Sequence, residues 1–208
     1  MEDLILHVFL NMTFKLIDNL KFVNVDMQYL MELHKISHEV YYNQHNYDNK
    51  PYLGILLSAD NYKYVIPLTS AKEKHKKWRI EEVDRFLIYE IINKELMIGD
   101  DIWIDVDKQT ENSGKKVYHI WSAIDLKKMI PVVDSVITEV DINIESKDTI
   151  ENIKYKNLLI NEYNFCLKII DKILIKASRV YEKQTKTKKG LKFCCDFKAL
   201  EKFVVQYK

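Results

Sequence analysis

The sequence predicts a single-domain α+β fold, and three observations support this prediction. Between residues 20 and 133, short apolar runs rich in β-branched and aromatic residues recur with few helical patterns among them, which is typical of a small, strongly bent sheet or barrel. Between residues 153 and 181, apolar residues instead recur at helical spacing, which predicts one long amphipathic helix. The 208 residues include only four Gly and three Pro, so the chain can bury one substantial core and has little room for a flexible linker.

The first elements expected are an arm, a strand and a helix. Residues 1–20 are expected to form an added helix or arm. Leu20–Val25 alternates as a strand does, and Asp26 is a favourable N-cap for a helix that runs toward Val40. Residues 41–49 lack periodicity and are expected to form a loop. The helix residues expected to face inward are Met27, Leu30, Met31 and either Leu33 or His34.

A hairpin is predicted next. Tyr52–Leu57 and Tyr64–Leu68 are rich in β-branched and aromatic residues, and the turn-forming residues Ser58–Asn61 separate them. We therefore expect two antiparallel strands joined by a short connection. Pro67 cannot donate a hydrogen bond to a ladder, which favours an edge position or a bulge at this point.

Lysines and hydroxyls lie at the ends of these two strands. Lys50 precedes the first strand, and Thr69 and Ser70 leave the second, so antiparallel pairing brings them to one edge of the sheet. Lys72 follows directly, and the hydroxyls are expected to be presented to solvent. Such a group suits phosphate binding, although Ser and Thr are also favoured N-caps and could simply cap the next helix. The spacing alone is equally compatible with both interpretations.

The remaining elements are less regular. Residues 80–96 permit a helix or a strand, and we favour the helix. Ile102–Val106 and Val117–Trp121 flank a polar loop with Asn-Ser-Gly, which indicates a second hairpin, and Met129–Val133 is expected to form a short strand. Asp196 is expected to cap a last helix. The apolar residues of that helix are Phe197, Leu200, Phe203 and Val204.

Charge is segregated along the chain although the formal net charge is only +1. This near-neutral balance argues against a protein that coats nucleic acid through bulk charge, so any RNA site must be a local patch. Acidic residues gather between residues 134 and 151. A late lysine cluster is best interpreted as a solvated face, whereas the cluster after Ser70 is favoured for phosphate binding because it adjoins the hydroxyls. The late cluster is Lys183, Lys186, Lys188, Lys189 and Lys192; the cluster after Ser70 is Lys72, Lys74, Lys76, Lys77 and Arg79.

Several other chemistries are disfavoured. The three cysteines show no Cys-x-x-Cys pair, and buried or inert thiols in a reducing compartment are expected. His34 and His38 lie four residues apart without a His-Glu-x-x-His element, so surface histidines are favoured over a metal site. No cofactor is indicated. Ser70-Ala-Lys72 lacks both the Ser-x-x-Lys spacing and the Gly-x-Ser-x-Gly elbow of serine hydrolases. No apolar run approaches the length of a membrane span, and we expect a cytoplasmic protein.

These residues resemble the ToxN/AbiQ family of endoribonuclease toxins from type III toxin–antitoxin systems. The hallmark of that family is a lysine before a strand followed by a Pro-Leu-Thr-Ser-x-Lys element, which here is Lys50 with Pro67–Lys72. The resemblance covers most of the chain after about residue 20. Further matching segments, in the same order, are Lys21-Phe22 leading to Tyr29-Leu30, Ile124–Pro131, the long helix from about Tyr155, and Cys195–Glu201.

The resemblance implies a fold and a domain boundary. It implies an SH3-like β-barrel core, shared with the Kid and MazF toxins, with helices packed around it. Residues 21–208 would form one endoribonuclease domain, and residues 1–20 would be an N-terminal extension. Two departures from the family pattern are Ala71, where proline is frequent, and residues 92–116, which are longer than usual and suggest an extra hairpin.

The resemblance also implies an activity and partners. It implies metal-independent cleavage of RNA by attack of the 2′-hydroxyl, which leaves a 2′,3′-cyclic phosphate and a 5′-hydroxyl. The implied partner is a pseudoknotted antitoxin RNA made of tandem repeats, which the enzyme itself processes and with which it assembles into a closed protein–RNA complex. The implied role is phage defence by abortive infection.

Catalytic and binding residues follow from the matching positions. Lys50 and Lys72 would neutralise the transition state, while Thr69 and Ser70 would hold the scissile phosphate or the attacking hydroxyl. Either a lysine of lowered pKa or a polarised hydroxyl could be the general base. His75 is a candidate acid, although a histidine on the helix surface is the favoured interpretation. The residues expected to contact RNA are Tyr47, Lys74, His75, Lys76, Lys77 and Arg79.

Two other functions are compatible with the same residues. A non-catalytic SH3-like module could bind RNA or a protein through the basic edge, and it would leave RNA intact. A Kid-like nuclease could be inhibited by a protein antitoxin. A tandem repeat array upstream of the gene would favour the RNA-inhibited toxin, and a small acidic reading frame would favour the Kid-like nuclease.

Overall fold

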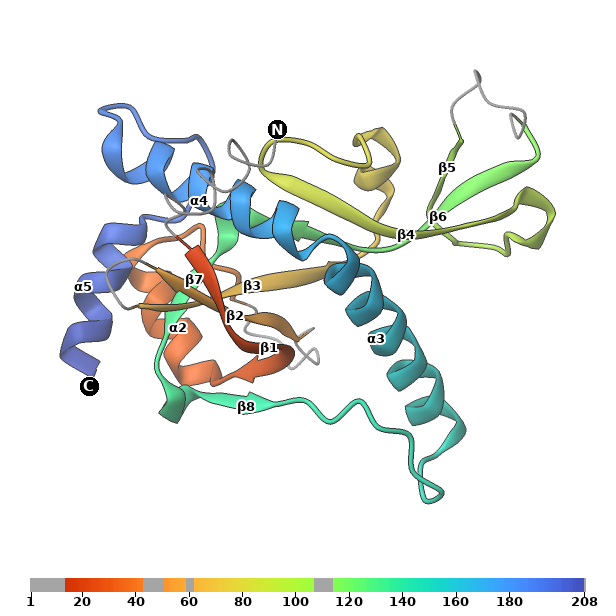
Figure 1. Ribbon diagram of the computed structural model, residues 1–208, viewed down its shortest axis with the longest axis horizontal. Helices are drawn as coiled ribbons and strands as arrows, with labels where there is room; N and C mark the ends of the chain where they lie inside the picture. The colour runs from red at the N-terminus through yellow and green to blue at the C-terminus, as the bar shows by residue number, and fades with distance from the viewer. Residues whose placement is uncertain (1–13, 43–50, 59–61, 107–113, 208) are drawn as a thin grey trace, which may run out of the picture.

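The computed structural model describes residues 14–42, 51–58, 62–106 and 114–207 (Figure 1). Within these ranges one antiparallel sheet has the strand order β4-β6-β3-β2-β1-β8, with β5 beside β6 and β7 beside β3. The strands are β1 (Phe14–Val25), β2 (Tyr52–Ser58), β3 (Lys63–Ser70), β4 (Arg85–Asn93), β5 (Trp103–Asp105), β6 (Lys116–Asp125), β7 (Ile130–Val132) and β8 (Ile137–Glu139). The helices are α2 (Met27–Ile36), α3 (Ile150–Lys168), α4 (Ile170–Lys186) and α5 (Phe197–Tyr207), with 3₁₀ turns η1 (Glu73–Lys77), η2 (Lys94–Leu96), η3 (Leu126–Lys128) and η4 (Asp134–Val136).

The predicted α+β class is confirmed, but a closed barrel is not. In the described part of the chain, β4 and β8 end the sheet and do not pair with each other. Figure 1 shows β8 on the opposite side of the molecule from β4, with α4 lying next to β1 and α5 beside β7. The sheet is therefore open and bent.

Strand β3 is where the sheet bends. Its first half, Lys63–Val65, pairs with β7, whereas its last three residues, Leu68–Ser70, pair with β6. Pro67 lies between these two segments, opposite Tyr52 of β2, and it is buried. The expected edge position or bulge is therefore wrong, because β3 is an interior strand. Proline fits here because its missing N–H falls in the gap where the neighbouring strand changes.

Both predicted hairpins are confirmed. Strands β2 and β3 pair antiparallel from Tyr52 opposite Pro67 to Leu57 opposite Lys63, and β5 pairs with β6. The predicted short strand near residue 130 is β7. Most of each connecting loop lies outside the described residues.

The helix favoured for residues 80–96 is wrong, because Arg85–Asn93 form β4. Phe86, Leu87 and Ile88 are all buried. Phe86 and Ile88 join the main core, whereas Leu87 packs in a second cluster with Ile120 on the other face. A strand covered on both faces gives a continuous apolar run, which lacks the alternation that would have distinguished it from a helix.

The beginning of the chain also differs from expectation. Residues 14–20 are not a helix or arm but the first part of β1, and Phe14 is fully buried with its N–H donating to Ser178 Oγ at 3.0 Å. Helix α2 is confirmed, with Asp26 accepting from the N–H of Tyr29 at 2.9 Å. It ends at Ile36, and its buried side chains are Tyr29, Leu30 and Leu33, whereas Met27 is exposed.

The single long helix expected between residues 153 and 181 is wrong, because two helices meet at Ile169. This residue leaves the helical conformation with ψ near 14°, and its N–H donates to Cys166 O at 3.1 Å. Figure 1 shows α3 leading away along the edge of the molecule while α4 turns across the sheet. The break lets each helix bury its own face, since α3 contacts β4 and β1 while α4 contacts β1 and α5. The last helix, α5, is confirmed, and Asp196 accepts from the N–H of Ala199.

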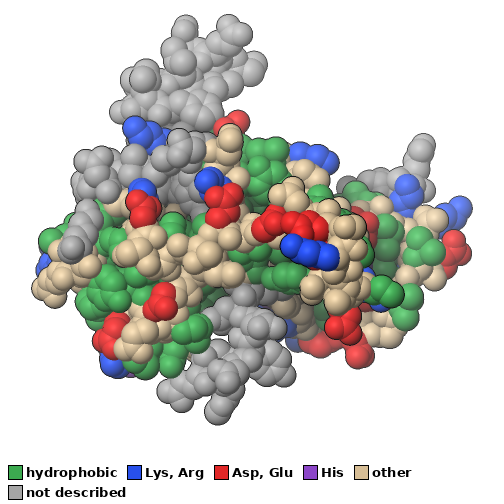
Figure 2. Space-filling view, turned by 90° about the horizontal axis from the view of Figure 1, so that it is seen from below, with side chains coloured by type: hydrophobic (Ala, Val, Ile, Leu, Met, Phe, Trp, Pro, Cys, Tyr) green, Lys and Arg blue, Asp and Glu red, His purple; other side chains and the backbone are tan. Residues whose placement is uncertain are grey.

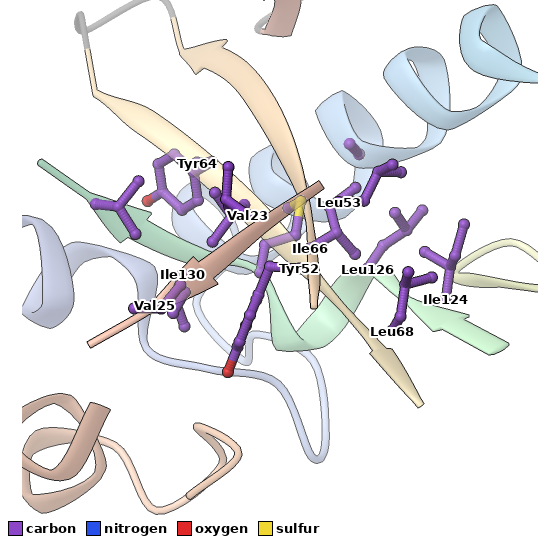
Figure 3. Close-up of a cluster of buried hydrophobic side chains, with 14 of the residues drawn as sticks. Val23, Val25, Tyr52, Leu53, Tyr64, Ile66, Leu68, Ile124, Leu126 and Ile130 are labelled. Carbon is purple, nitrogen blue, oxygen red and sulfur yellow. The ribbon is translucent and has the colours of Figure 1, made fainter. Parts of the chain in front are cut away.

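The core lies between the bent sheet and helices α4 and α5. Figure 3 shows side chains of β1, β2, β3, β6 and β7 converging there, with Tyr64 and Ile66 fully buried. The expected buried thiols are confirmed, because Cys166, Cys194 and Cys195 are free and buried. Burial raises the pKa of the Cys194 thiol to about 12.

A buried carboxylate ties α5 to this core. Glu201 Oε1 accepts from Tyr64 Oη at 2.8 Å and from Tyr181 Oη at 2.6 Å, and Glu201 Oε2 lies 2.9 Å from Lys198 Nζ. Glu201 is 3% exposed. Burial, with the nearby Glu201 charge second, raises the pKa of Tyr64 well above its usual value.

We expect Glu201→Leu to lower the free energy of unfolding by about 2–4 kcal/mol, because two buried hydroxyls would lose their acceptor. Glu201→Gln keeps an acceptor oxygen and should cost less. Urea unfolding of the two variants measures the difference. A Leu variant as stable as the Gln variant would show that these hydrogen bonds contribute nothing to stability.

Candidate active site

The candidate site is built where β3 ends. Thr69 and Ser70 are the last residues of β3 and pair with Ala123 and Ser122 of β6. The backbone continues in register beyond the strand, since the Ala71 N–H donates to Trp121 O at 3.1 Å. The sheet therefore fixes the backbone conformation of Thr69, Ser70 and Ala71, directly before Lys72.

The two hydroxyls have different surroundings. Ser70 is exposed, which confirms the expectation that it is presented to solvent, whereas Thr69 is partly buried. Thr69 Oγ1 donates to Ala123 O in a long contact of 3.4 Å. Because successive side chains of a strand point to opposite faces, the two hydroxyls leave β3 in opposite directions. Ser70 is the hydroxyl that is better placed to meet a ligand.

The alternative that these hydroxyls cap the next helix is wrong. That helix is only the 3₁₀ turn η1, its N-cap residue is Lys72, and no side chain caps its first N–H groups. Instead, the side chain of His75 within the turn accepts a hydrogen bond from the Lys72 N–H. The hydroxyls of Thr69 and Ser70 are therefore not occupied in helix capping.

His75 differs most from its prediction. It is 0% exposed, so the interpretation as a surface histidine is wrong, and its side chain is not accessible to RNA in this structure. Burial lowers the pKa of His75 to about 4, and the nearby charges of Lys74, Lys72 and Arg85 act in the same direction. The ring is therefore neutral near pH 7.

The basic cluster after Ser70 surrounds η1, and all five of its members are exposed: Lys72, Lys74, Lys76, Lys77 and Arg79. Lys76 pairs with Glu73 at 2.7 Å, and Lys74 Nζ lies 5.5 Å from the centroid of the Trp78 ring. On the face drawn in Figure 2, acidic and basic side chains are interspersed, in keeping with a net charge of +1. The late lysine cluster is also exposed.

Lys50 and Tyr47 lie outside the described residues. The chain is described again from Pro51, whose carbonyl accepts from the N–H of Leu68 at 3.4 Å. Pro51 thus lies beside the β3 segment that leads into Thr69 and Ser70.

Within the described residues, no three His, Cys, Asp or Glu side chains gather closely enough to hold a metal ion. None of the described helices is long and apolar enough to cross a membrane.

Sequence reasoning missed two contacts that support the site. Ser122 lies directly across from Ser70, and its buried Oγ has no hydrogen-bond partner in the described part of the chain. The Arg85 guanidinium stacks over Trp78 at 4.2 Å and joins η1 to β4. A serine inside the apolar run of β6 could have signalled the first contact, whereas nothing in the local sequence signals the second.

Fold and site together define an α+β protein that presents an exposed hydroxyl and a group of cations at the end of an interior strand. The family model described as Toxin ToxN, type III toxin–antitoxin system, matches residues 21–205. The chain belongs to this family, and the expected family is confirmed.

Individual relatives agree with this assignment. Endoribonuclease ToxN of Bacillus thuringiensis subsp. kurstaki is 26% identical over 198 residues, which cover 92% of this chain and 86% of the relative. Endoribonuclease AbiQ of Lactococcus lactis subsp. lactis is 29% identical over 190 residues, which cover 88% and 86%. These matches span nearly the whole of each protein.

Solved structures share the fold. One, from work on selective toxin inhibition by a non-coding RNA pseudoknot in bacterial type III systems, superposes with a TM-score of 0.66 at 22% identity and covers 91% of this chain and 98% of that chain. The structure of AbiQ, a lactococcal anti-phage endoribonuclease, superposes with a TM-score of 0.63 at 23% identity and covers 91% and 98%. At these identities the likeness establishes the fold.

Proposed function

We propose that this protein is a metal-independent endoribonuclease toxin of a type III toxin–antitoxin system. The observation that carries the proposal is the family match over residues 21–205, which includes an exposed Ser70 and Lys72 at the end of β3. The relatives named above are endoribonucleases. The hydroxyl and ammonium groups at this edge suit RNA cleavage, which needs no covalent bond between enzyme and RNA.

The proposed mechanism uses the nucleophile that RNA itself carries. The 2′-hydroxyl attacks the adjacent phosphorus, the bond to the 5′-oxygen of the next nucleotide breaks, and a 2′,3′-cyclic phosphate and a 5′-hydroxyl result. Charge develops on the non-bridging oxygens, where a donated hydrogen bond and a fixed positive charge lower the barrier. Ser70 donates the hydrogen bond, and the Lys72 ammonium supplies a compact positive charge.

Lys50 and Thr69 complete the proposed catalytic group. Lys50 is bonded to Pro51, which lies beside the β3 segment that precedes Thr69, and this neighbourhood supports an approach of Lys50 to the same phosphate. Thr69 supports the strand end through its contact with Ala123 and has a smaller direct role. A lysine or a polarised hydroxyl would take the proton from the attacking 2′-hydroxyl, and a protonated lysine would give a proton to the leaving 5′-oxygen, because the buried His75 is not in reach.

The basic cluster is proposed to bind the RNA backbone on either side of the cleaved bond. Lys74, Lys76, Lys77 and Arg79 are exposed, and their charges are concentrated although the whole chain carries only +1. Tyr47 is proposed to stack on a base. Because such binding releases counterions, it should weaken as salt rises.

The proposed partner is an antitoxin RNA of tandem repeats. A structural relative comes from work on toxin inhibition by a non-coding RNA pseudoknot, and another from work in which a processed non-coding RNA regulates a bacterial antiviral system. By analogy, this toxin would cut its own repeat RNA and assemble with the pseudoknotted units in a closed complex in the cytoplasm. The role would be abortive infection.

The finer architecture is part of the same proposal. Residues 21–208 would form one endoribonuclease domain with an SH3-like core related to the Kid and MazF toxins. The change of partner along β3 and the strong bend of the sheet support that relation. Residues 92–116, the segment that holds η2 and β5, would form an extra hairpin that alters the substrate groove.

Incubation with RNA tests the proposal against a non-catalytic binding module. Purified protein and a 5′-labelled RNA pool of random sequence should give discrete shortened products, and binding should weaken with salt. Salt-sensitive binding with intact RNA after long incubation would favour the binding module. An upstream tandem repeat array, as opposed to a small acidic reading frame, would identify the antitoxin as RNA.

A further inference from the structure

The buried ring of His75 lies directly behind the proposed catalytic residue Lys72. His75 Nδ1 accepts from the Lys72 N–H at 3.0 Å, and the His75 N–H donates to Lys72 O at 2.8 Å. These two bonds join the backbone of Lys72 to both the side chain and the backbone of His75. They fix the point at which the extended chain after β3 enters η1.

Aromatic and cationic groups hold the ring in place. The imidazole packs on Trp78 with ring centroids 4.5 Å apart, and the Trp78 ring is itself covered by Arg85. The charges that act on the ring are Lys74 and Lys72 from η1 and its N-cap, and Arg85 from β4, which itself pairs with Glu82. All three are cations, and together with burial they oppose a further positive charge on the ring.

The hydrogen bond also determines the tautomer. Nδ1 can accept from the Lys72 N–H only when it carries no proton, so the neutral ring must carry its proton on Nε2. Nε2 is buried, and it has no hydrogen-bond partner in the described part of the chain. In the described part of the chain the ring is thus hydrogen-bonded through Nδ1, an acceptor that an apolar side chain at this position would lack.

We propose that His75 is a positioning residue for catalysis, which holds the backbone of Lys72 through a neutral, Nε2-protonated imidazole so that the Lys72 ammonium meets the scissile phosphate. The inference rests on the proposed function, because it assumes that Lys72 acts on the phosphate. In this role His75 neither contacts RNA directly nor transfers a proton. Small errors in the position of a catalytic group can cost about 10²-fold in rate. Loss of the hydrogen bond from the Lys72 N–H to His75 should therefore slow cleavage measurably.

Two substitutions of His75 separate this role from others. His75→Asn keeps an oxygen near the position of Nδ1 that can accept from the Lys72 N–H, whereas His75→Leu fills similar space without an acceptor. At saturating protein, the single-turnover rate of cleavage of the 5′-labelled random RNA pool should fall about 10- to 100-fold for the Leu variant, with the half-saturating protein concentration within about twofold of wild type. The Asn variant should stay within about threefold of the wild-type rate. A Leu variant with the wild-type single-turnover rate, or Asn and Leu variants that lose activity equally, would overturn the proposal.

A spectroscopic measurement covers the case in which the Leu variant does not fold. Nitrogen NMR of the ¹⁵N-histidine-labelled wild-type protein at pH 6 should show His75 as a neutral ring protonated on Nε2, because the low pKa keeps it uncharged. A charged imidazolium at pH 6, or a ring protonated on Nδ1, would contradict the proposal regardless of any variant.

Lys72→Ala, assayed alongside, distinguishes this inference from the proposed function. If Lys72→Ala cleaves at the wild-type rate, the role assigned to Lys72 fails and His75 has nothing to position. If Lys72→Ala is impaired while His75→Leu is not, the proposed function stands and only the positioning role fails.

Discussion

Ser70→Ala is expected to lower the single-turnover rate of RNA cleavage by about 10²- to 10³-fold, the usual cost of removing one donor to a developing oxyanion. Ser70 is exposed at the end of β3, so its hydroxyl is available to a phosphate oxygen. Loss of an exposed hydroxyl should leave the free energy of unfolding nearly unchanged. The measurement is single-turnover cleavage at saturating protein, with urea unfolding as the check on stability.

Thr69→Val is the matched control for Ser70→Ala. It removes the neighbouring hydroxyl, which already donates to Ala123 of β6 and leaves the strand on the opposite face. We expect a loss of at most about tenfold, well below the cost of removing a donor from the transition state. A larger effect at Thr69 than at Ser70 would reverse the roles assigned to the two residues.

Lys72→Ala is expected to have an effect of similar size, about 10²- to 10³-fold on kcat, because it removes the charge proposed to stabilise the phosphorane. Lys72→Arg keeps the charge but replaces a compact ammonium with a planar fork, so we expect intermediate activity. The rate at saturating RNA isolates this chemical contribution from binding. The same measurement on Lys50→Ala tests the second proposed cation.

Lys77→Ala is the control that removes one nearby positive charge without removing a proposed catalytic group. Lys77 is exposed on the same turn as His75 and also belongs to the basic cluster. Its removal should raise KM by about two- to tenfold at moderate salt and leave kcat unchanged, because it contacts only the RNA backbone in our account. Equal losses of kcat for Lys72→Ala and Lys77→Ala would indicate a general electrostatic effect and contradict a specific role for Lys72.

The hairpin that carries the site could be predicted from sequence, because its strand patterns and turn residues are local. Strand β4 could not, since its residues are covered on both faces and their alternation is lost. The break at Ile169 has no Gly or Pro to announce it, and it follows from the different surfaces that α3 and α4 cover. Tertiary packing decided both of these elements.

In the site, too, some features could be predicted from the sequence and others depend on tertiary packing. Pro67–Lys72 could be assigned from the resemblance, and the exposure of Ser70 followed from its place at the strand end. His75 stands in the polar run Lys-Glu-Lys-His-Lys-Lys, which is typical of a solvated turn. Its burial depends on Trp78 and Arg85, and Arg85 comes from the next strand. A local pattern cannot report a contact of that kind.

Analysis of the ends produced by RNA cleavage in excess EDTA tests the central claim most directly. Our account predicts undiminished cleavage that leaves 2′,3′-cyclic phosphate and 5′-hydroxyl ends, and loss of these products with Ser70→Ala. Cleavage that requires a divalent metal and leaves 5′-phosphate ends would contradict it.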